Sequence, residues 1–175
     1  GNVIDPFDLI GRYGTDAVRY YLLREITPFE DSDITEEKFK EVYNANLANG
    51  LGNLTARIMK MSEQYLSQCS HPRHPMSGMG VPKEYHEFMD NYELNKAMDF
   101  IWDKISELDL HIQKTEPFKV AKQDKEKAKE ILRYLISELS QIAITLRPFL
   151  PETSEKILDA IKQNKMPKPL FLRKK

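Results

Sequence analysis

Cysteine is nearly absent from this sequence, with Cys69 the single one among 175 residues. One cysteine excludes an internal disulfide framework and any zinc site built on a CxxC pair. No apolar run approaches the roughly 18 residues of a membrane-spanning helix, and no secretory leader is visible. An excess of one charge is also missing, because 26 Lys and Arg stand against 27 Asp and Glu, so any nucleic-acid site has to rest on local features. We expect a cytoplasmic domain without a metal or a membrane partner.

Prolines divide the rest of the chain into segments long enough for helices. Proline is poorly tolerated inside a helix, and none lies between Pro28 and Pro72, between Pro82 and Pro117, or between Pro117 and Pro148. Each segment carries apolar residues at the three- and four-residue spacing of an amphipathic helix. Strand signals are weak throughout, so the pattern predicts an all-α, antiparallel helical bundle. The helices are expected over residues 35–68, 94–112, 128–146 and 151–164.

The first thirty residues have a different pattern, with shorter elements. Asp5 followed by Pro6 is typical of an N-cap with proline at the first helical position, which predicts a short helix over residues 6–13. A second short helix is expected over residues 15–24. Further along, residues 69–81 are rich in Pro and Gly and are expected to form a loop.

The helix expected over residues 35–68 carries a polar stripe that a core does not need. At about 100° per residue, its core face is formed by Tyr43, Leu47, Leu51, Leu54, Ile58, Met61 and Tyr65. A quarter turn away lie Asn46, Asn49, Asn53, Arg57, Lys60 and Gln64. Asparagine is a poor helix former, and Gly50 and Gly52 each destabilise the helix by about 1 kcal/mol relative to alanine.

Two interpretations of this stripe remain open. In the first, the glycines admit a neighbouring helix closely and the asparagine side chains hold loop backbone. In the second, Asn53 and Arg57, adjacent at i and i+4, bind the edge of a nucleic-acid base, because amide and guanidinium groups form planar pairs of hydrogen bonds. Periodicity does not decide between them.

Several stretches of the sequence match a known family. They are GNVIDPFDLIGRYGTDAVRYYLLRE at 1–25, DSDI at 31–34, YNANLANGLGNLTARIMKM at 43–61, EPFKVAK at 116–122 and LRPFLPETSEKI at 146–157. Together they resemble methionyl-tRNA synthetase, a class I family. In that family, the segment that these stretches match begins directly after the KMSKS loop. The resemblance implies a stem-contact segment over residues 1–32 and an α-helical anticodon-binding bundle over residues 33–175.

The resemblance also implies that the catalytic functions of such an enzyme belong to a part outside this sequence. The HIGH and KMSKS motifs are absent from the sequence, so no catalytic residue is expected and the chain alone should be inactive. No cofactor is expected here either, since ATP, Mg and any zinc would belong to the catalytic half. The implied partners are the anticodon stem-loop of tRNA(Met) and the catalytic domain of the same chain.

In that family an Asn and an Arg of one helix, and an aromatic residue after the next long helix, recognise the CAU anticodon. Carried over by motif, these are Asn53 and Arg57 in GNLTAR and Phe118 in EPFKVAK. Phe118 is a departure, because the family usually has Trp there; a phenyl ring still stacks on bases, with less area and no N–H. The alternative is that Phe118 packs with Val120 into the bundle.

Basic side chains surround these positions. We expect the phosphate backbone to be contacted by Lys60, Lys114, Lys119 and Lys122. The inner side of the tRNA could be contacted by Arg12, Arg19 and Arg24, with a structural role as the alternative for Arg19.

Two other functions stay open at this point. A synthetase for Cys, Val, Ile or Leu also carries a helical anticodon domain, although GNLxxR and PFKVAK favour methionine. The other is a helical protein-interaction module that does not bind RNA. Such a module would not explain together the polar stripe, Gly50 and Gly52, and the basic side chains around Phe118. We therefore predict anticodon recognition on behalf of an enzyme that attaches methionine to tRNA using ATP.

Overall fold

The computed structural model describes residues 4–26, 34–66 and 81–175, and every regular element in these ranges is helical. The elements are α1 (Pro6–Tyr13), α2 (Thr15–Tyr20), η1 (Tyr21–Glu25), α3 (Glu36–Val42), η2 (Tyr43–Gly52), α4 (Asn53–Tyr65), α5 (Lys83–Asp90), α6 (Leu94–Thr115), α7 (Pro117–Gln123), α8 (Lys125–Leu146) and α9 (Pro151–Gln163), where η marks π-helix. The predicted all-α fold is confirmed. None of these helices has the length and apolar character needed to cross a membrane.

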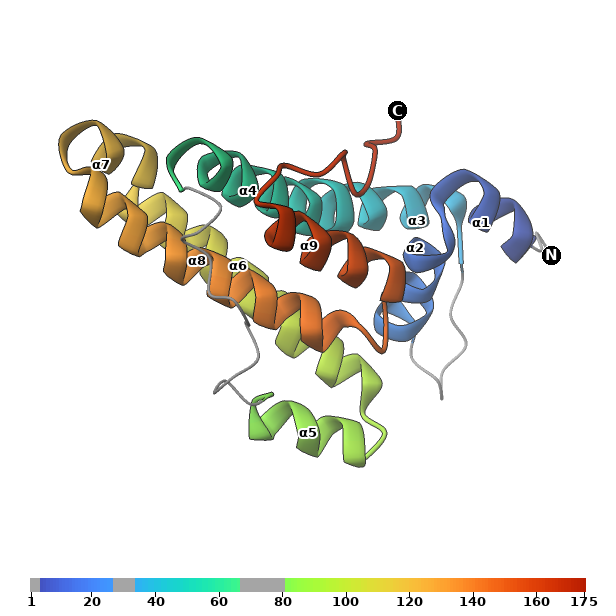
Figure 1. Cartoon of the computed structure of the whole chain (residues 1–175). Coiled ribbons are helices and arrows are strands. Elements are labelled where there is room, and N and C mark those ends of the chain that lie inside the picture. The colour runs from blue at the N-terminus through green and yellow to red at the C-terminus, as the bar shows by residue number, and fades with distance from the viewer. Residues whose placement is uncertain (1–3, 27–33, 67–80) are drawn as a thin grey trace.

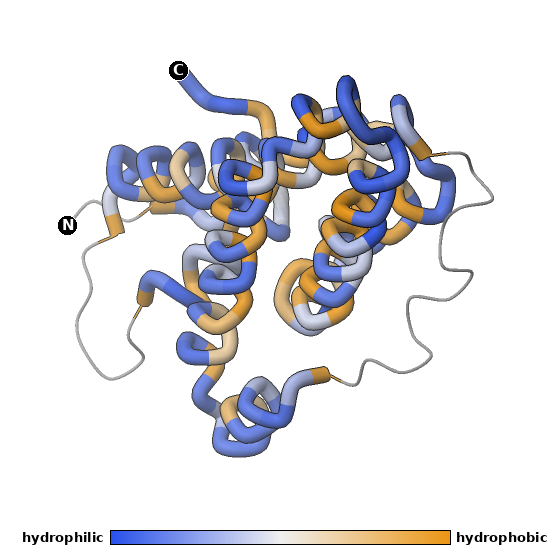
Figure 2. The backbone as a smooth tube through the Cα atoms, turned by 90° about the vertical axis from the view of Figure 1, so that its left-hand side faces the viewer, coloured by the Kyte–Doolittle hydropathy of each residue, from blue (hydrophilic) through white to orange (hydrophobic). Residues whose placement is uncertain are grey.

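The long helices α4, α6 and α8 form the body of the bundle (Figure 1). Helices α6 and α8 run antiparallel, with α7 covering the end where they are joined, while α9 packs on both α8 and α4. Helices α1 and α2 lie at the opposite end from α7, and α5 projects below α6. In Figure 2 hydrophobic and hydrophilic residues alternate along the long helices, as amphipathic packing requires. The periodicity predicts the four long helices but neither α5 nor α7.

The N-terminal segment is fixed to the bundle by its arginines. Asp5 caps α1 by accepting a hydrogen bond from the backbone N–H of Phe7 at 2.9 Å, as its position before proline predicts. Arg19 donates to the backbone oxygens of Phe149, at 2.6 Å, and Pro148, at 2.9 Å. These two hydrogen bonds support the structural role for Arg19 rather than contact with tRNA.

The other two arginines of this segment also have partners within the chain. Arg24 donates to Asp99 of α6 at 2.8 Å and lies 5.1 Å from the centre of the Trp102 ring. Arg12 forms ion pairs with Asp8 and Glu36. These contacts occupy side chains that the sequence alone leaves available for tRNA.

The helix predicted over residues 35–68 is continuous through α3, η2 and α4, but its middle is π-helical. Its start is as predicted, because the hydroxyl of Thr35 accepts from the backbone N–H of Lys38. Its predicted core face is partly wrong: Met61 and Tyr65 are only half-buried, whereas Met59, outside the predicted face, is fully buried. The physical reason is that α4 packs against both α8 and α9, which widens its buried arc.

The chain after α9 returns along α3 and η2 (Figure 1). The side-chain amide of Asn44 exchanges two hydrogen bonds with the backbone of Lys174, both at 2.9 Å. Phe171 packs near Gly52, where an added Cβ would lie 3.8 Å from the Phe171 ring and 3.0 Å from the oxygen of Leu47. Phe171 is thus at ordinary van der Waals distance, the crowding comes from Leu47 of the same helix, and none of the three nearest atoms belongs to a neighbouring helix. The loop predicted over residues 69–81 falls almost wholly outside the described ranges.

Candidate functional site

An ion pair between two helices lies at the centre of the polar stripe. Arg57 of α4 donates through Nη1 to the Oδ1 atom of Asp109 on α6. The other oxygen of Asp109 accepts from the Nε2 atom of Gln113, one turn along α6, at 2.6 Å. The side chains of Arg57 and Asp109 remain 36% and 35% exposed, so a ligand can reach both.

The ion pair lines a hollow of about 270 Å³ between the η2–α4 helix and α6. Its lining comprises Asn49, Gly50, Asn53, Leu54, Arg57, Ile105, Ser106, Asp109, Leu110 and Gln113. Asn49 and Asn53 are exposed, and neither side chain makes a hydrogen bond within the part of the chain that the structure describes. The asparagines that hold backbone are instead Asn44 and Asn164, which lie outside the stripe.

Phe118 lies on α7, the short helix that follows this end of α6. Glu116 adopts a left-handed conformation, with φ of 41°, that ends α6, and Pro117 starts α7 at its first position. Pro117 and Ala121 are buried and anchor α7, whereas the ring of Phe118 is 44% exposed. The ring is therefore presented to solvent, which excludes its burial in the bundle.

The four predicted phosphate-contacting lysines are all exposed. Lys119 forms an ion pair with Glu116 at 2.7 Å. Lys60, Lys114 and Lys122 have no ion-pair partner among the described residues, so their charges are free to meet a phosphate.

A second hollow of about 270 Å³, not predicted from the sequence, lies between α6 and α8. The rings of His111 and Tyr134, which both line it, are in contact, with their centroids 4.8 Å apart. Lys114 also lines it, and Leu110 borders both this hollow and the one around Arg57. The contact joins residues of two different helices, α6 and α8, so no pattern within a single helix reveals it.

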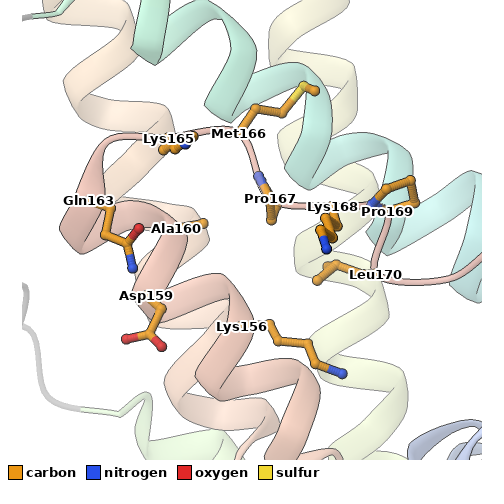
Figure 3. Close-up of a pocket in the computed structure, with 10 residues that line it drawn as sticks. All are labelled: Lys156, Asp159, Ala160, Gln163, Lys165, Met166, Pro167, Lys168, Pro169 and Leu170. Carbon is orange, nitrogen blue, oxygen red and sulfur yellow. The ribbon is translucent and has the colours of Figure 1, made fainter.

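A third and larger hollow, of about 450 Å³, lies between α9 and the tail (Figure 3). Lys156, Lys165 and Lys168 border it, over a floor that includes Leu170 and Ala160. It shares no lining residue with the hollow around Arg57. No metal-binding group of three His, Cys, Asp or Glu side chains occurs in the described ranges, and Cys69 lies outside them.

Comparison with known families decides which kind of protein this helical bundle belongs to. The family described as "Anticodon binding domain of methionyl tRNA ligase" matches residues 80–172. The chain belongs to the methionyl-tRNA ligase family. A second family, "tRNA synthetases class I (M)", matches residues 1–59. Membership in this family argues against the Cys, Val, Ile and Leu alternatives.

Relatives support the same assignment. The Methionine--tRNA ligase of Clostridium acetobutylicum is 38% identical over 90% of this chain and 26% of its own length. That of Thermotoga maritima is 32% identical over 95% of this chain and 28% of its own length. The chain thus spans about a quarter of the length of these curated relatives.

Solved structures share the fold. The apo form of Mycobacterium tuberculosis methionyl-tRNA synthetase superposes with a TM-score of 0.79 at 23% identity, over 98% of this chain and 41% of that one. The complex of the same enzyme with methionyl-adenylate gives a TM-score of 0.73 at 25% identity, over 91% of this chain and 34% of that one. Each of these two solved chains therefore contains the same helical architecture.

Proposed function

We propose that this chain binds the anticodon stem-loop of tRNA(Met) and recognises its CAU anticodon. In this proposal it serves a cytoplasmic methionine–tRNA ligase whose catalytic domain, in the same protein, attaches methionine using ATP. Residues 1–32 connect that domain to the bundle of residues 33–175. The observation that carries the proposal is the pair of exposed Asn53 and partly exposed Arg57, whose polar groups line one hollow beside the core-packed face of their helix.

The proposed contacts follow from the chemistry of each side chain. Single-stranded anticodon bases are splayed out and recognised at their edges. Asn53 offers an unpaired amide and Arg57 a partly exposed guanidinium, both suited to planar hydrogen bonding with a base. The exposed ring of Phe118 provides a surface on which a base stacks.

The backbone of the stem-loop needs positive charge beside these groups. In this proposal it is held by the exposed side chains of Lys60, Lys114, Lys119 and Lys122. The ion pair of Lys119 with Glu116 is at the surface and contributes only about 0–1 kcal/mol, so it does not prevent Lys119 from turning to a phosphate.

The proposal is tested by titrating the chain with a hairpin RNA that carries the CAU loop, beside a hairpin changed only at the first anticodon base. About 0.1 M salt damps non-specific attraction, since the Debye length is then about 10 Å. A clear preference for CAU is expected. Equal, salt-sensitive binding to both hairpins would leave only a backbone-binding surface, and absence of binding would favour the protein-interaction module.

The variant Arg57→Ala extends the same titration. It is expected to weaken CAU binding more than tenfold, because it removes both a pair of hydrogen bonds to a base edge and the positive charge that strengthens them. Equal affinity of variant and parent would remove Arg57 from the site.

A further inference from the structure

We infer that Asp109 is a specificity-determining residue of this site: its carboxylate accepts a hydrogen bond from the amino group of the anticodon cytosine while Arg57 donates to the same base edge. The inference rests on the proposed function and adds a contact that the sequence motifs do not contain. The ion pair between Arg57 and Asp109 places donor and acceptor side by side.

The ion pair leaves hydrogen-bonding capacity unused on both partners. A guanidinium carries five N–H donors, and Arg57 directs one of them to Asp109. A carboxylate offers about four acceptor positions, of which Asp109 uses one for Arg57 and one for Gln113. The remaining groups form a surface with guanidinium donors at one end and a carboxylate acceptor at the other. About a third of each side chain is exposed at the hollow.

This order of donors and acceptor matches one pyrimidine and opposes the other. The pairing edge of cytosine presents two acceptors, O2 and N3, followed by the amino group as a donor. Uracil presents N3–H where cytosine has an acceptor, and O4 where cytosine has the amino group. Uracil would therefore place a donor against the guanidinium of Arg57 and an oxygen against the carboxylate of Asp109. Both mismatches are repulsive, so the pair discriminates between bases of the same shape.

A carboxylate is otherwise out of place in this hollow. Phosphate groups are repelled by negative charge, so a surface that served the RNA backbone alone would be better without Asp109. Carboxylates do suit cytosine, whose exocyclic amine they accept from. The contact from Gln113 fixes the orientation of Asp109 and leaves its Oδ1 side directed toward Arg57. A base-binding role accounts for both the charge and its support.

The test compares Asp109→Asn with the parent chain on hairpins that carry CAU and UAU. The parent is expected to prefer CAU by at least tenfold. An amide both donates and accepts, so Asp109→Asn should bring the two affinities to within about threefold. Asp103→Asn removes the same charge from an exposed position of α6 outside the hollow and is expected to keep the parent's preference. Circular dichroism checks that each variant is folded.

A base analogue isolates the proposed hydrogen bond. Pyrimidin-2-one in place of the anticodon cytosine keeps O2 and N3 but lacks the amino group. The parent should bind this hairpin at least fivefold more weakly than CAU, whereas Asp109→Ala should bind both hairpins equally. That result separates contact with the base from a role in orienting Arg57.

The opposite outcomes are distinct. If Asp109→Asn weakens both hairpins equally and keeps the preference for CAU, Asp109 only positions Arg57 and the inference is overturned. If the parent discriminates CAU from UAU but binds the analogue as well as cytosine, the inference fails while the proposed function stands. If the parent binds no hairpin, both fail.

Discussion

The carboxylate of Asp16 in α2 accepts two hydrogen bonds from Thr153 in α9, one from the backbone N–H and one from the hydroxyl, both at 2.7 Å. Thr153 belongs to the first turn of α9, whose N-cap residue Leu150 provides no side-chain hydrogen bond. The first N–H groups of a helix lack partners within it, so Asp16 serves as a cap supplied by another helix. Its negative charge also lies at the positive end of the helix dipole.

Replacement of Asp16 by Asn should destabilise the fold. The variant loses a charged acceptor in a buried position, and hydrogen bonds to charged groups contribute about 1.5–3 kcal/mol. Urea unfolding followed by circular dichroism measures the change in the free energy of unfolding. Asp159→Asn, at an exposed site on the same helix α9, is the control and should change stability by less than about 0.5 kcal/mol. Equal stability of the two variants would contradict the capping role.

Asn164 ends α9 with a left-handed conformation, φ of 48°, and its buried amide donates to the backbone oxygen of Leu66 at 2.8 Å. Asn164→Gly and Asn164→Ala both lose this hydrogen bond and should be less stable than the parent by about 1–3 kcal/mol. Alanine should be worse than glycine by about a further 1 kcal/mol, because only alanine is strained at positive φ. Urea unfolding of the two variants compares them directly. Equal loss in both would assign the whole effect to the side-chain hydrogen bond.

The sequence predicts the long helices well because each buries an apolar stripe at a regular spacing. It does not predict that η2 is π-helical, since the period used to read the stripe assumes regular α-helix throughout. Nor does it predict the burial of Met59, which lies on a helix that packs against both α8 and α9. Short helices such as α7 have too few residues to show a period.

Only those residues of the candidate site that lie on a single helix could be predicted from the sequence. Asn53 and Arg57 stand out in one helix because polar groups interrupt its pattern, and both lie at the hollow. Asp109 was not predictable, because an acid on the polar side of α6 resembles any solvated charge until the fold places it against Arg57. The same holds for the contact of His111 with Tyr134.

Tyr85 of α5 donates its hydroxyl to the backbone oxygen of Thr145 in α8 at 2.8 Å. Burial raises the pKa of this phenol from 10.0 to about 12. Ionisation is thus easier in the unfolded chain, so the stability that neutral Tyr85 provides is complete below about pH 10 and is lost as the pH rises toward 12.

Tyr85→Phe should lower the free energy of unfolding at pH 7 by about 0.5–1.5 kcal/mol, the usual net contribution of one hydrogen bond. The same variant should lose less stability than the parent between pH 9 and about 11, since it has no phenol to ionise at this position. Urea unfolding at several pH values measures both effects. Parallel alkaline profiles of variant and parent would show that ionisation of Tyr85 does not limit stability.

Phe118 offers a test of base stacking that is separate from stability, because its ring is 44% exposed. Phe118→Ala should weaken binding of the CAU hairpin by about 5- to 150-fold, equivalent to about 1–3 kcal/mol for one stacked base. Its free energy of unfolding should change by less than about 0.5 kcal/mol. Fluorescence titration and urea unfolding measure the two quantities on the same samples.

Two further variants decide whether stacking is the cause. Phe118→Trp enlarges the aromatic surface and should bind the hairpin more tightly than the parent. Phe7→Ala removes an aromatic ring that is 79% exposed on α1, at the opposite end of the bundle from α7 (Figure 1), and should leave binding unchanged. If Phe118→Ala bound the hairpin as tightly as Phe7→Ala, the stacked base would lie elsewhere, and the His111–Tyr134 contact beside Lys114 is the surface to mutate next.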